Sequence, residues 1–164
     1  MVGNAIAQSA QPIISYNFGL GYRSRVVATE RIALLTSVVS GGIIMAAFTL
    51  FPHILVGLFI SPDNPAARIA IAGYPYFSAA FIFFILNLTV IGYYQSVERV
   101  KPATFLALLR GFIFLIPSFI LLPQAIGTKG IWLALCLSEM LTTLVIVVIY
   151  SRATRKVCLQ QRTE

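Results

Sequence analysis

The chain has 164 residues, of which 59% are hydrophobic and only 10% are charged, and its formal net charge is +7. Soluble domains carry about 25% charged residues, so this composition excludes a water-soluble globular fold. The basic residues lie at the ends of apolar runs rather than on one face, which argues against nucleic-acid binding despite the positive charge.

Five apolar runs, separated by Pro, Gly and basic residues, predict an all-α bundle that crosses a membrane several times. The expected spans cover approximately residues 3–17, 32–51, 69–93, 103–122 and 131–150. A helix of about 20 residues crosses about 30 Å of hydrocarbon, and the first run is the least apolar and the shortest. We therefore expect one transmembrane region over residues 1–150, followed by a basic tail over residues 151–164.

Helix starts and stops are visible between these runs. Asn17-Phe18-Gly19 is a helix stop, and the Ser, Asp and Asn of residues 61–65 suit the N-cap of a following helix. Pro75 lies within the third run, and Pro117 interrupts the fourth. A short loop over residues 127–130 joins the fourth and fifth runs, which predicts that these two spans are antiparallel neighbours.

The positions of Lys and Arg predict the orientation of the chain. Nine of these residues lie in the gaps after the first and third runs and in the tail, whereas Arg68 and Lys129 lie on the opposite side. Loops rich in Lys and Arg stay in the cytoplasm. Five crossings would therefore place the C-terminal tail in the cytoplasm and Met1 outside.

The first run carries a polar stripe of Asn4, Gln8, Gln11 and Ser15, which are spaced so that they share one face of a helix. Polar groups at membrane depth are costly unless they are paired or hydrated. The stripe is therefore interpreted as the wall of a water-filled cavity. The alternative is that these side chains form hydrogen bonds between helices.

The third run places Tyr76, Asn87 and Tyr94 on nearly the same side of a straight helix. Amide and phenol groups on an aromatic face suit a pocket for flat organic cations, because aromatic faces attract cations. The alternative is ordinary packing, with the Tyr side chains anchored at the membrane interface.

Glu139 is the only carboxylate within the five expected spans, and it lies ten residues beyond Lys129, close to the middle of the membrane. Such a group can bind a proton or a cation during a transport cycle. Arg110, on the neighbouring fourth span, is expected at a similar depth. A coupling site and a structural ion pair between Arg110 and Glu139 are both open at this point.

The sequence offers no set of residues typical of a catalytic or metal site. Cys136 and Cys158 are far apart, so neither a disulfide nor a metal site is expected from them. No Walker lysine motif is present, and Gly19-x-Gly21 lacks the third glycine of a dinucleotide site. An intramembrane acyltransferase or protease would need a His-Asp, Ser-Lys or paired-Asp arrangement at membrane depth. We therefore expect a protein that is not an enzyme and that needs no cofactor.

Three strings resemble sequences of the MATE (multidrug and toxic compound extrusion) family. One is Gln11-Pro12-Ile13-Ile14-Ser15-Tyr16-Asn17-Phe18-Gly19, followed by a basic gap. The second is Leu108-Leu109-Arg110, before a Pro-bearing span. The third is Gly127-x-x-Gly130-Ile131-Trp132-x-Ala134, with Glu139 soon after. Their order and spacing are similar to the C-terminal half of such a transporter.

The resemblance implies a fold of twelve helices in two six-helix lobes around a central cleft. It implies antiport in the plasma (inner) membrane, in which drugs or organic cations leave as protons or sodium ions enter. The five expected spans are similar to the family's eighth to twelfth helices, so the chain resembles most of one lobe. A separate chain could supply the missing helices.

The same resemblance places the family's acidic coupling residues on its first, seventh and tenth helices. The segment similar to the tenth helix has only Asn87 as a polar candidate. We therefore expect that this chain alone inserts into the membrane and does not export substrate. Half of a central cleft cannot alternate between the two sides of the membrane.

Two other interpretations stay open. A lipid-linked oligosaccharide flippase of the same superfamily would need a more cationic cleft than Arg110 alone provides. A non-transporting remnant that only packs against other membrane proteins would need no cleft. The expected partners are the lipid bilayer and, for a transporter, a small organic cation, and no nucleic acid is expected.

Overall fold

The computed structural model describes residues 2–61 and 63–160, with side chains up to residue 150, so residues 161–164 of the expected tail lie outside the described part. The elements are α1 (Val2–Gly19), α2 (Arg23–Leu50), α3 (Pro52–Gly57), α4 (Pro65–Ser78), α5 (Ala80–Ser96), α6 (Val100–Leu108), the π-helix η1 (Leu109–Ile113), α7 (Leu115–Ile126) and α8 (Thr128–Gln160). Since the described residues contain helices and no strand, the all-α prediction is confirmed.

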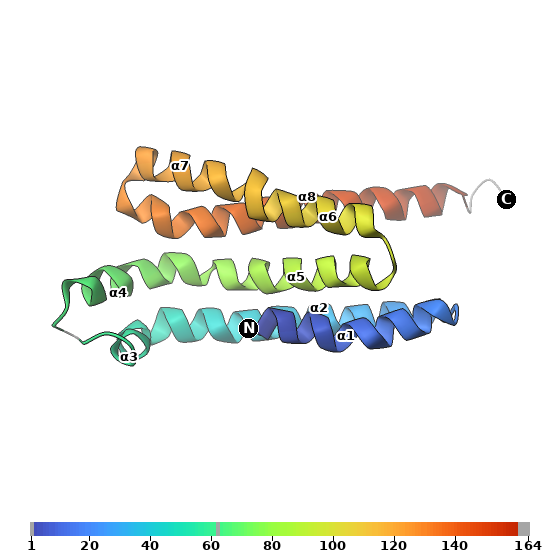
Figure 1. The fold of residues 1–164 in the computed structure, drawn as a ribbon, viewed down its shortest axis with the longest axis horizontal. Coiled ribbons are helices and arrows are strands. Elements are labelled where there is room, and N and C mark those ends of the chain that lie inside the picture. Colours follow the sequence, from blue (N-terminus) through green and yellow to red (C-terminus); the bar gives the residue numbers. More distant parts are fainter. Residues whose placement is uncertain (1, 62, 161–164) are drawn as a thin grey trace.

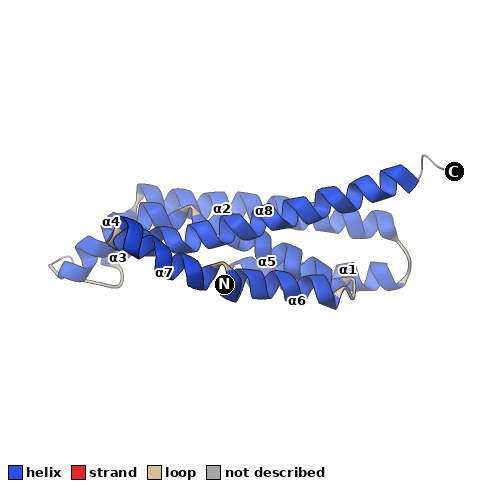
Figure 2. Ribbon diagram, turned by 90° about the horizontal axis from the view of Figure 1, so that it is seen from above, coloured by secondary structure: helices blue, strands red, loops and turns tan. Residues whose placement is uncertain are grey.

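Helix α5 is the centre of the bundle. In Figure 1 it runs between α1 and α2 on one side and α6, α7 and α8 on the other. Seen from above in Figure 2, α1 and α6 share one flank of α5, and α2 and α8 share the opposite flank. Residue contacts agree, because α5 packs against α1, α2, α6 and α8.

The interior of the bundle is small and its outer surface is apolar. One buried cluster includes Val90 and Tyr94 of α5, Leu106 of α6 and Ile146 of α8. Many large apolar side chains point outward from the long helices, including Leu35, Ile43, Phe112, Ile116 and Leu144. An apolar surface of this extent is what helices in lipid present, since the bilayer is their solvent.

The helices that are long and apolar enough to cross a membrane agree in part with the expected spans. In the described residues these are Arg23–Leu50, Val100–Ile126 and Thr128–Tyr150. The pair Pro65–Ser78 and Ala80–Ser96 qualifies as one broken span, bent by 50°. Helix α1 is not apolar enough to be counted with them. Five crossings therefore stay a prediction.

The turn between the first two helices is shorter than the sequence suggested. Helix α1 ends at Gly19, as the helix stop predicts. Helix α2 begins at Arg23 rather than near residue 32, so the basic stretch forms its first turns instead of a loop. Gly21 makes the tight connection, with a φ of +78° that favours glycine.

Side-chain capping and a proline are features of the first half of the broken span. Asn64 is the N-cap of α4, and its side chain accepts a hydrogen bond from the backbone N–H of Ala66, at 2.9 Å, as the sequence predicted for this loop. Pro75 lies inside α4 and removes one backbone donor. The Ser78 hydroxyl donates to the Pro75 carbonyl at 2.9 Å, and the helix direction changes immediately afterwards.

The fourth span is interrupted upstream of Pro117, at the π-helix η1. The Phe114 N–H donates to the carbonyl of Leu109 at 2.9 Å, which is a bond over five residues. Pro117 lies in the first turn of α7, where its missing N–H is tolerated. The break is therefore a local widening of the helix that contains Arg110.

The connection to the fifth span is also tighter than expected. Thr128, Lys129 and Gly130 form the first turn of α8, so the loop over residues 127–130 reduces to Gly127, with a φ of +68°. A Cβ on Gly130 would lie 2.3 Å from the Leu122 carbonyl oxygen, so only glycine allows this close approach. The antiparallel packing of α7 on α8 is confirmed.

The ends of the bundle separate by charge. The turns between α1 and α2 and between α5 and α6 lie at the same end as the C-terminal part of α8 (Figure 1). Together with the first turns of α2 and α6, these segments contain eight of the nine basic residues counted on one side in the sequence, and Arg162 lies outside the described residues. We call this end of the bundle the basic end. Its location in the cytoplasm stays a prediction.

Candidate functional site

A buried ion pair joins the fourth and fifth expected spans. The Arg110 Nε donates to Glu139 Oε1 at 2.6 Å, and the Arg110 and Glu139 side chains are 16% and 2% exposed. The antiparallel packing of η1 and α7 against α8 brings the two residues to the same depth. The expected proximity of Arg110 and Glu139 is therefore observed.

Asn87 of α5 completes this cluster. Its amide nitrogen donates to Glu139 Oε2 at 2.8 Å and to the Glu139 backbone carbonyl at 2.9 Å. Its amide oxygen accepts a hydrogen bond from the Thr143 hydroxyl at 2.9 Å. The reversed amide orientation would place an oxygen against two acceptors, so the hydrogen-bond network itself fixes the orientation. We call Asn87, Arg110, Glu139 and Thr143 the charge cluster.

The π-helix gives Arg110 its position in the charge cluster. A π-helical turn widens the ring of the backbone and disturbs its regular hydrogen bonds. The Ser138 hydroxyl of α8 donates to the Arg110 carbonyl oxygen at 3.3 Å. Because Ser138 and Glu139 both lie on α8, this helix binds the backbone carbonyl of Arg110 through Ser138 and its guanidinium through Glu139.

Arg110 also faces an open cavity. Its guanidinium carbon lies 4.1 Å from the centre of the Phe84 ring, within the range of a cation–π contact. A cavity of about 280 Å³ adjoins Arg110 and Glu139 and is otherwise lined by α5, α6, η1, α7 and α8. The almost fully buried Glu139 therefore borders this cavity.

Three of the four residues of the polar stripe line a second cavity, of about 370 Å³, between α1 and α5, and the fourth, Ser15, donates a hydrogen bond to the Ser96 carbonyl. Asn4, Gln8 and Gln11 contribute to its wall from α1, and Gln95 contributes from α5. The Gln11 amide nitrogen donates to Gln95 Oε1 at 3.1 Å. We call this space the glutamine cavity. The stripe therefore lines a cavity and also forms a hydrogen bond between helices, so both interpretations of it apply.

The glutamine cavity and the cavity beside the charge cluster are neighbours. Leu88 and Ile91 of α5 line both of them. The glutamine cavity is lined by α1 and α5, and the cavity beside the charge cluster is lined by α5, α6, η1, α7 and α8. Four of the candidate site residues, Gln8, Gln11, Arg110 and Glu139, therefore line two adjacent cavities.

The predicted common face of Tyr76, Asn87 and Tyr94 is wrong. The prediction assumed one straight helix, whereas Tyr76 lies on α4 and the other two residues lie on α5, beyond the 50° bend. Tyr76 is 39% exposed and lines a separate cavity with Trp132 and Lys129, while Asn87 and Tyr94 are buried. These three side chains do not form one aromatic pocket.

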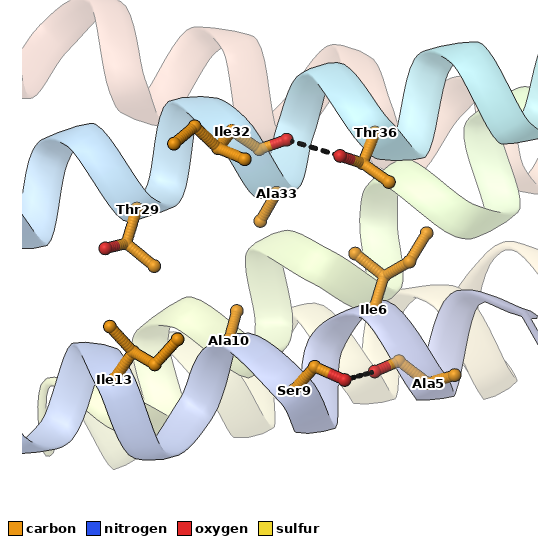
Figure 3. A pocket seen from close by; sticks show the side chains of 9 residues that line it. All are labelled: Ala5, Ile6, Ser9, Ala10, Ile13, Thr29, Ile32, Ala33 and Thr36. Carbon is orange, nitrogen blue, oxygen red and sulfur yellow. Dashed lines mark hydrogen bonds between the residues drawn. The ribbon is translucent and has the colours of Figure 1, made fainter.

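Another groove, between α1 and α2, is apolar and holds no charged group (Figure 3). The Ser9 hydroxyl donates to the Ala5 carbonyl, and the Thr36 hydroxyl donates to the Ile32 carbonyl, so both are satisfied within their own helices. Nothing in this groove distinguishes a ligand from lipid or a packed helix.

Sequence reasoning missed several residues of these sites. Gln95 and Phe84 have no distinctive sequence signal, because an amide near a helix end and a Phe in an apolar run are common. Glu30 lies outside the expected span over residues 32–51 and was not singled out, although α2 includes it and the residue is 4% exposed. Among the described residues, no three His, Cys, Asp or Glu side chains come together as a metal site would need.

A family model, MatE, matches residues 1–120 of the chain. The chain belongs to the MatE family. A search of curated proteins found no match, and neither did a search of solved structures. The matched range contains Gln8, Gln11, Asn87 and Arg110, and it ends before Glu139.

Members of the MatE family are transporters rather than enzymes. Together with the long apolar helices, this makes the chain a multi-pass membrane protein of a transporter family. The resemblance inferred from the sequence is therefore confirmed for the family.

Proposed function

We propose that this MatE-family chain is part of a secondary antiporter that exports drugs or organic cations in exchange for protons or sodium ions. In this proposal the protein lies in the plasma membrane with its basic end in the cytoplasm. The observation that supports it best is the buried Glu139 carboxylate, which adjoins one of two neighbouring cavities along α5. A carboxylate at membrane depth can exchange a proton or sodium ion for an organic cation.

The charge cluster gives a physical link between binding of an ion at Glu139 and movement of the helices. Glu139 accepts one hydrogen bond from a cation and one from an amide, so its negative charge is balanced when the cluster is closed. A proton, sodium ion or organic cation that reached Glu139 would compete with Arg110. Such competition links occupation of the carboxylate to movement of η1 against α8, which is a requirement for alternating access.

The pairing of Arg110 also bears on the flippase alternative. A pyrophosphate-bearing substrate needs free cationic groups in the cleft. Arg110 is the one basic residue that the sequence places within a span, and its charge is balanced by Glu139. This arrangement favours a cationic substrate over an anionic one.

The test is a chimera in which this chain replaces the corresponding helices of a complete MatE-family exporter. Efflux of a cationic dye from cells that lack other exporters is measured under imposed proton and sodium gradients. We expect the chimera to export the dye with one of these gradients, and we expect Glu139→Gln to remove the gradient dependence. The matched control is Glu98→Gln, which removes an exposed carboxylate at the basic end.

Three results would contradict the proposal. Dye retention by a stable, membrane-inserted chimera under both gradients would argue against antiport of cations. Unchanged gradient dependence in Glu139→Gln would remove the carboxylate from coupling. Efflux by cells that express this chain alone would refute the expectation that it needs the other helices.

A further inference from the structure

Glu30 is a buried carboxylate on the opposite flank of α5 from the glutamine cavity. It lies two turns into α2, and 4% of the residue is exposed. Among the described residues, no hydrogen bond or salt bridge reaches its carboxylate. A buried charge without a partner is costly, so a partner from outside the chain would stabilise it.

A cavity of about 330 Å³ lies beside Glu30 and is formed by α2, α5 and α8. The part of this cavity that lies closest to the basic end of the bundle is lined by Glu30, Tyr94 and Tyr150. Further toward the middle of the bundle its wall is aliphatic and consists of Leu34, Leu86, Val90, Ile146 and Val147. The cavity is therefore polar and acidic at one end and apolar along its length. We call it the Glu30 cavity.

The polar end suits a cation. Tyr94 and Tyr150 line the cavity together with Glu30, so two aromatic rings share this space with the carboxylate. Among the described residues, the cation whose charge acts on Glu30 is Arg31, which is exposed and forms no salt bridge with it. Aromatic rings and a carboxylate attract ammonium groups.

We propose that the Glu30 cavity binds the ammonium head group of an amphiphile, with the hydrocarbon chain of that molecule along the aliphatic wall. A bare sodium ion fits less well, because the wall offers few oxygen atoms beyond one carboxylate and two phenols. Tyr side chains near the basic end indicate the depth of a membrane interface, where the head group of an amphiphile lies.

Two kinds of molecule share this chemistry. One is a membrane lipid with an amino head group, such as phosphatidylethanolamine. The other is a free lipophilic cation, such as an alkyltrimethylammonium ion. Each presents a positive nitrogen at the interface and an apolar chain below it, so the experiment includes both.

The test is native mass spectrometry of the full chain, purified in a non-ionic detergent and titrated separately with phosphatidylethanolamine and with dodecyltrimethylammonium. We expect at least one of them to bind, and we expect Glu30→Gln to weaken that binding tenfold or more. Glu98→Gln is the matched control, because it removes an exposed carboxylate at the same end of the bundle and should leave binding unchanged. Binding of the lipid alone identifies the first source, and binding of the alkylammonium alone identifies the second.

A second variant tests the cavity without changing its charge. Val147 is 59% exposed at the rim of the cavity, so Val147→Trp should fold and fill the space beside Glu30. We expect it to weaken the same ligand as Glu30→Gln does, and it decides the test if Glu30→Gln does not give a monodisperse protein. Binding that is unchanged in Val147→Trp, or an absence of binding by both ligands, would overturn the proposal. Equal, Glu30-dependent binding of phosphatidylglycerol, which lacks an ammonium group, would also overturn it.

Discussion

The charge cluster and the glutamine cavity lie side by side along α5, but they use polar groups differently. In the charge cluster, Asn87, Glu139 and Thr143 use their polar atoms on one another and on Arg110. In the glutamine cavity, the hydrogen bond from Gln11 to Gln95 joins two residues, while Gln8 remains exposed.

This difference distinguishes polar residues that stabilise the fold from polar residues that are available to a ligand, which the sequence alone could not do. Polar groups that are satisfied by the protein stabilise one conformation and resist substitution. Polar groups that face an open cavity contribute little to stability and are available to water or a ligand. We therefore expect large losses of stability at the charge cluster, and small losses of stability with changes in ligand binding at the glutamine cavity.

The largest effect is expected from breaking the ion pair. Removing one partner of a buried salt bridge costs about 3–5 kcal/mol, because the other charge is left without compensation. Arg110→Gln and Glu139→Gln should each lower the thermal stability of the detergent-purified chain strongly. The double variant should be more stable than either single variant, since it leaves no uncompensated charge. A double variant that loses the sum of the two single effects would show that the pair is not coupled.

The next effect is expected at Asn87. Asn87→Leu leaves Glu139 Oε2 and the Glu139 carbonyl without their amide donor, which costs about 1–3 kcal/mol for a buried acceptor. Thr143→Val is the matched comparison, because it removes one neutral hydrogen bond to Asn87, worth about 0.5–1.5 kcal/mol. Unfolding midpoints of the two variants measure the difference. Equal midpoints would mean that Asn87 does not hold the carboxylate.

Gly92 tests the packing that brings α1 to the glutamine cavity. A Cβ at this position would lie 3.1 Å from the Ala7 Cβ, so α1 must shift slightly to accept Gly92→Ala, and the variant should be less stable than a Gly→Ala change without such a contact. Gly42→Ala is the control, because no atom lies within 4 Å of its added Cβ and both variants gain the same helix propensity, about 1 kcal/mol. Thermal unfolding of both variants checks this, and equal changes in stability would contradict the close packing of α1 on α5.

Much of the fold could be predicted because it follows from periodic patterns. Apolar runs and helix stops gave the order of the helices, and a short loop gave the antiparallel pair that joins Arg110 to Glu139. The errors arose where tertiary structure altered a local pattern. The bend between α4 and α5 separated Tyr76 from Asn87, and a straight helical wheel cannot represent such a bend.

The site was predictable only where a residue was unusual for its surroundings. Glu139 stood out as a carboxylate in an apolar run, but Glu30 was hidden because it follows a basic stretch that resembles a loop. The π-helix at Arg110 could not be predicted, because it depends on how α8 packs and where Ser138 donates its hydrogen bond. These features depend on contacts between residues that are far apart in the sequence, so no local sequence pattern indicates them.

The smallest effect on stability is expected at Gln11. Gln11→Leu removes a hydrogen bond between membrane helices, and such bonds are worth about 0.6 kcal/mol on average. Its effect on transport should be larger, because the amide that remains on Gln95 would face an apolar side chain in the cavity. In the chimera we expect Gln11→Leu to reduce dye efflux severalfold while the amount of folded protein in the membrane stays the same. Ser9→Ala is the control on the same helix, since its hydroxyl donates to its own backbone in the apolar groove and not in the glutamine cavity. If Gln11→Leu instead lowered folded protein and efflux in parallel, the glutamine cavity would be a packing contact like the charge cluster, and the difference between the two regions would not hold.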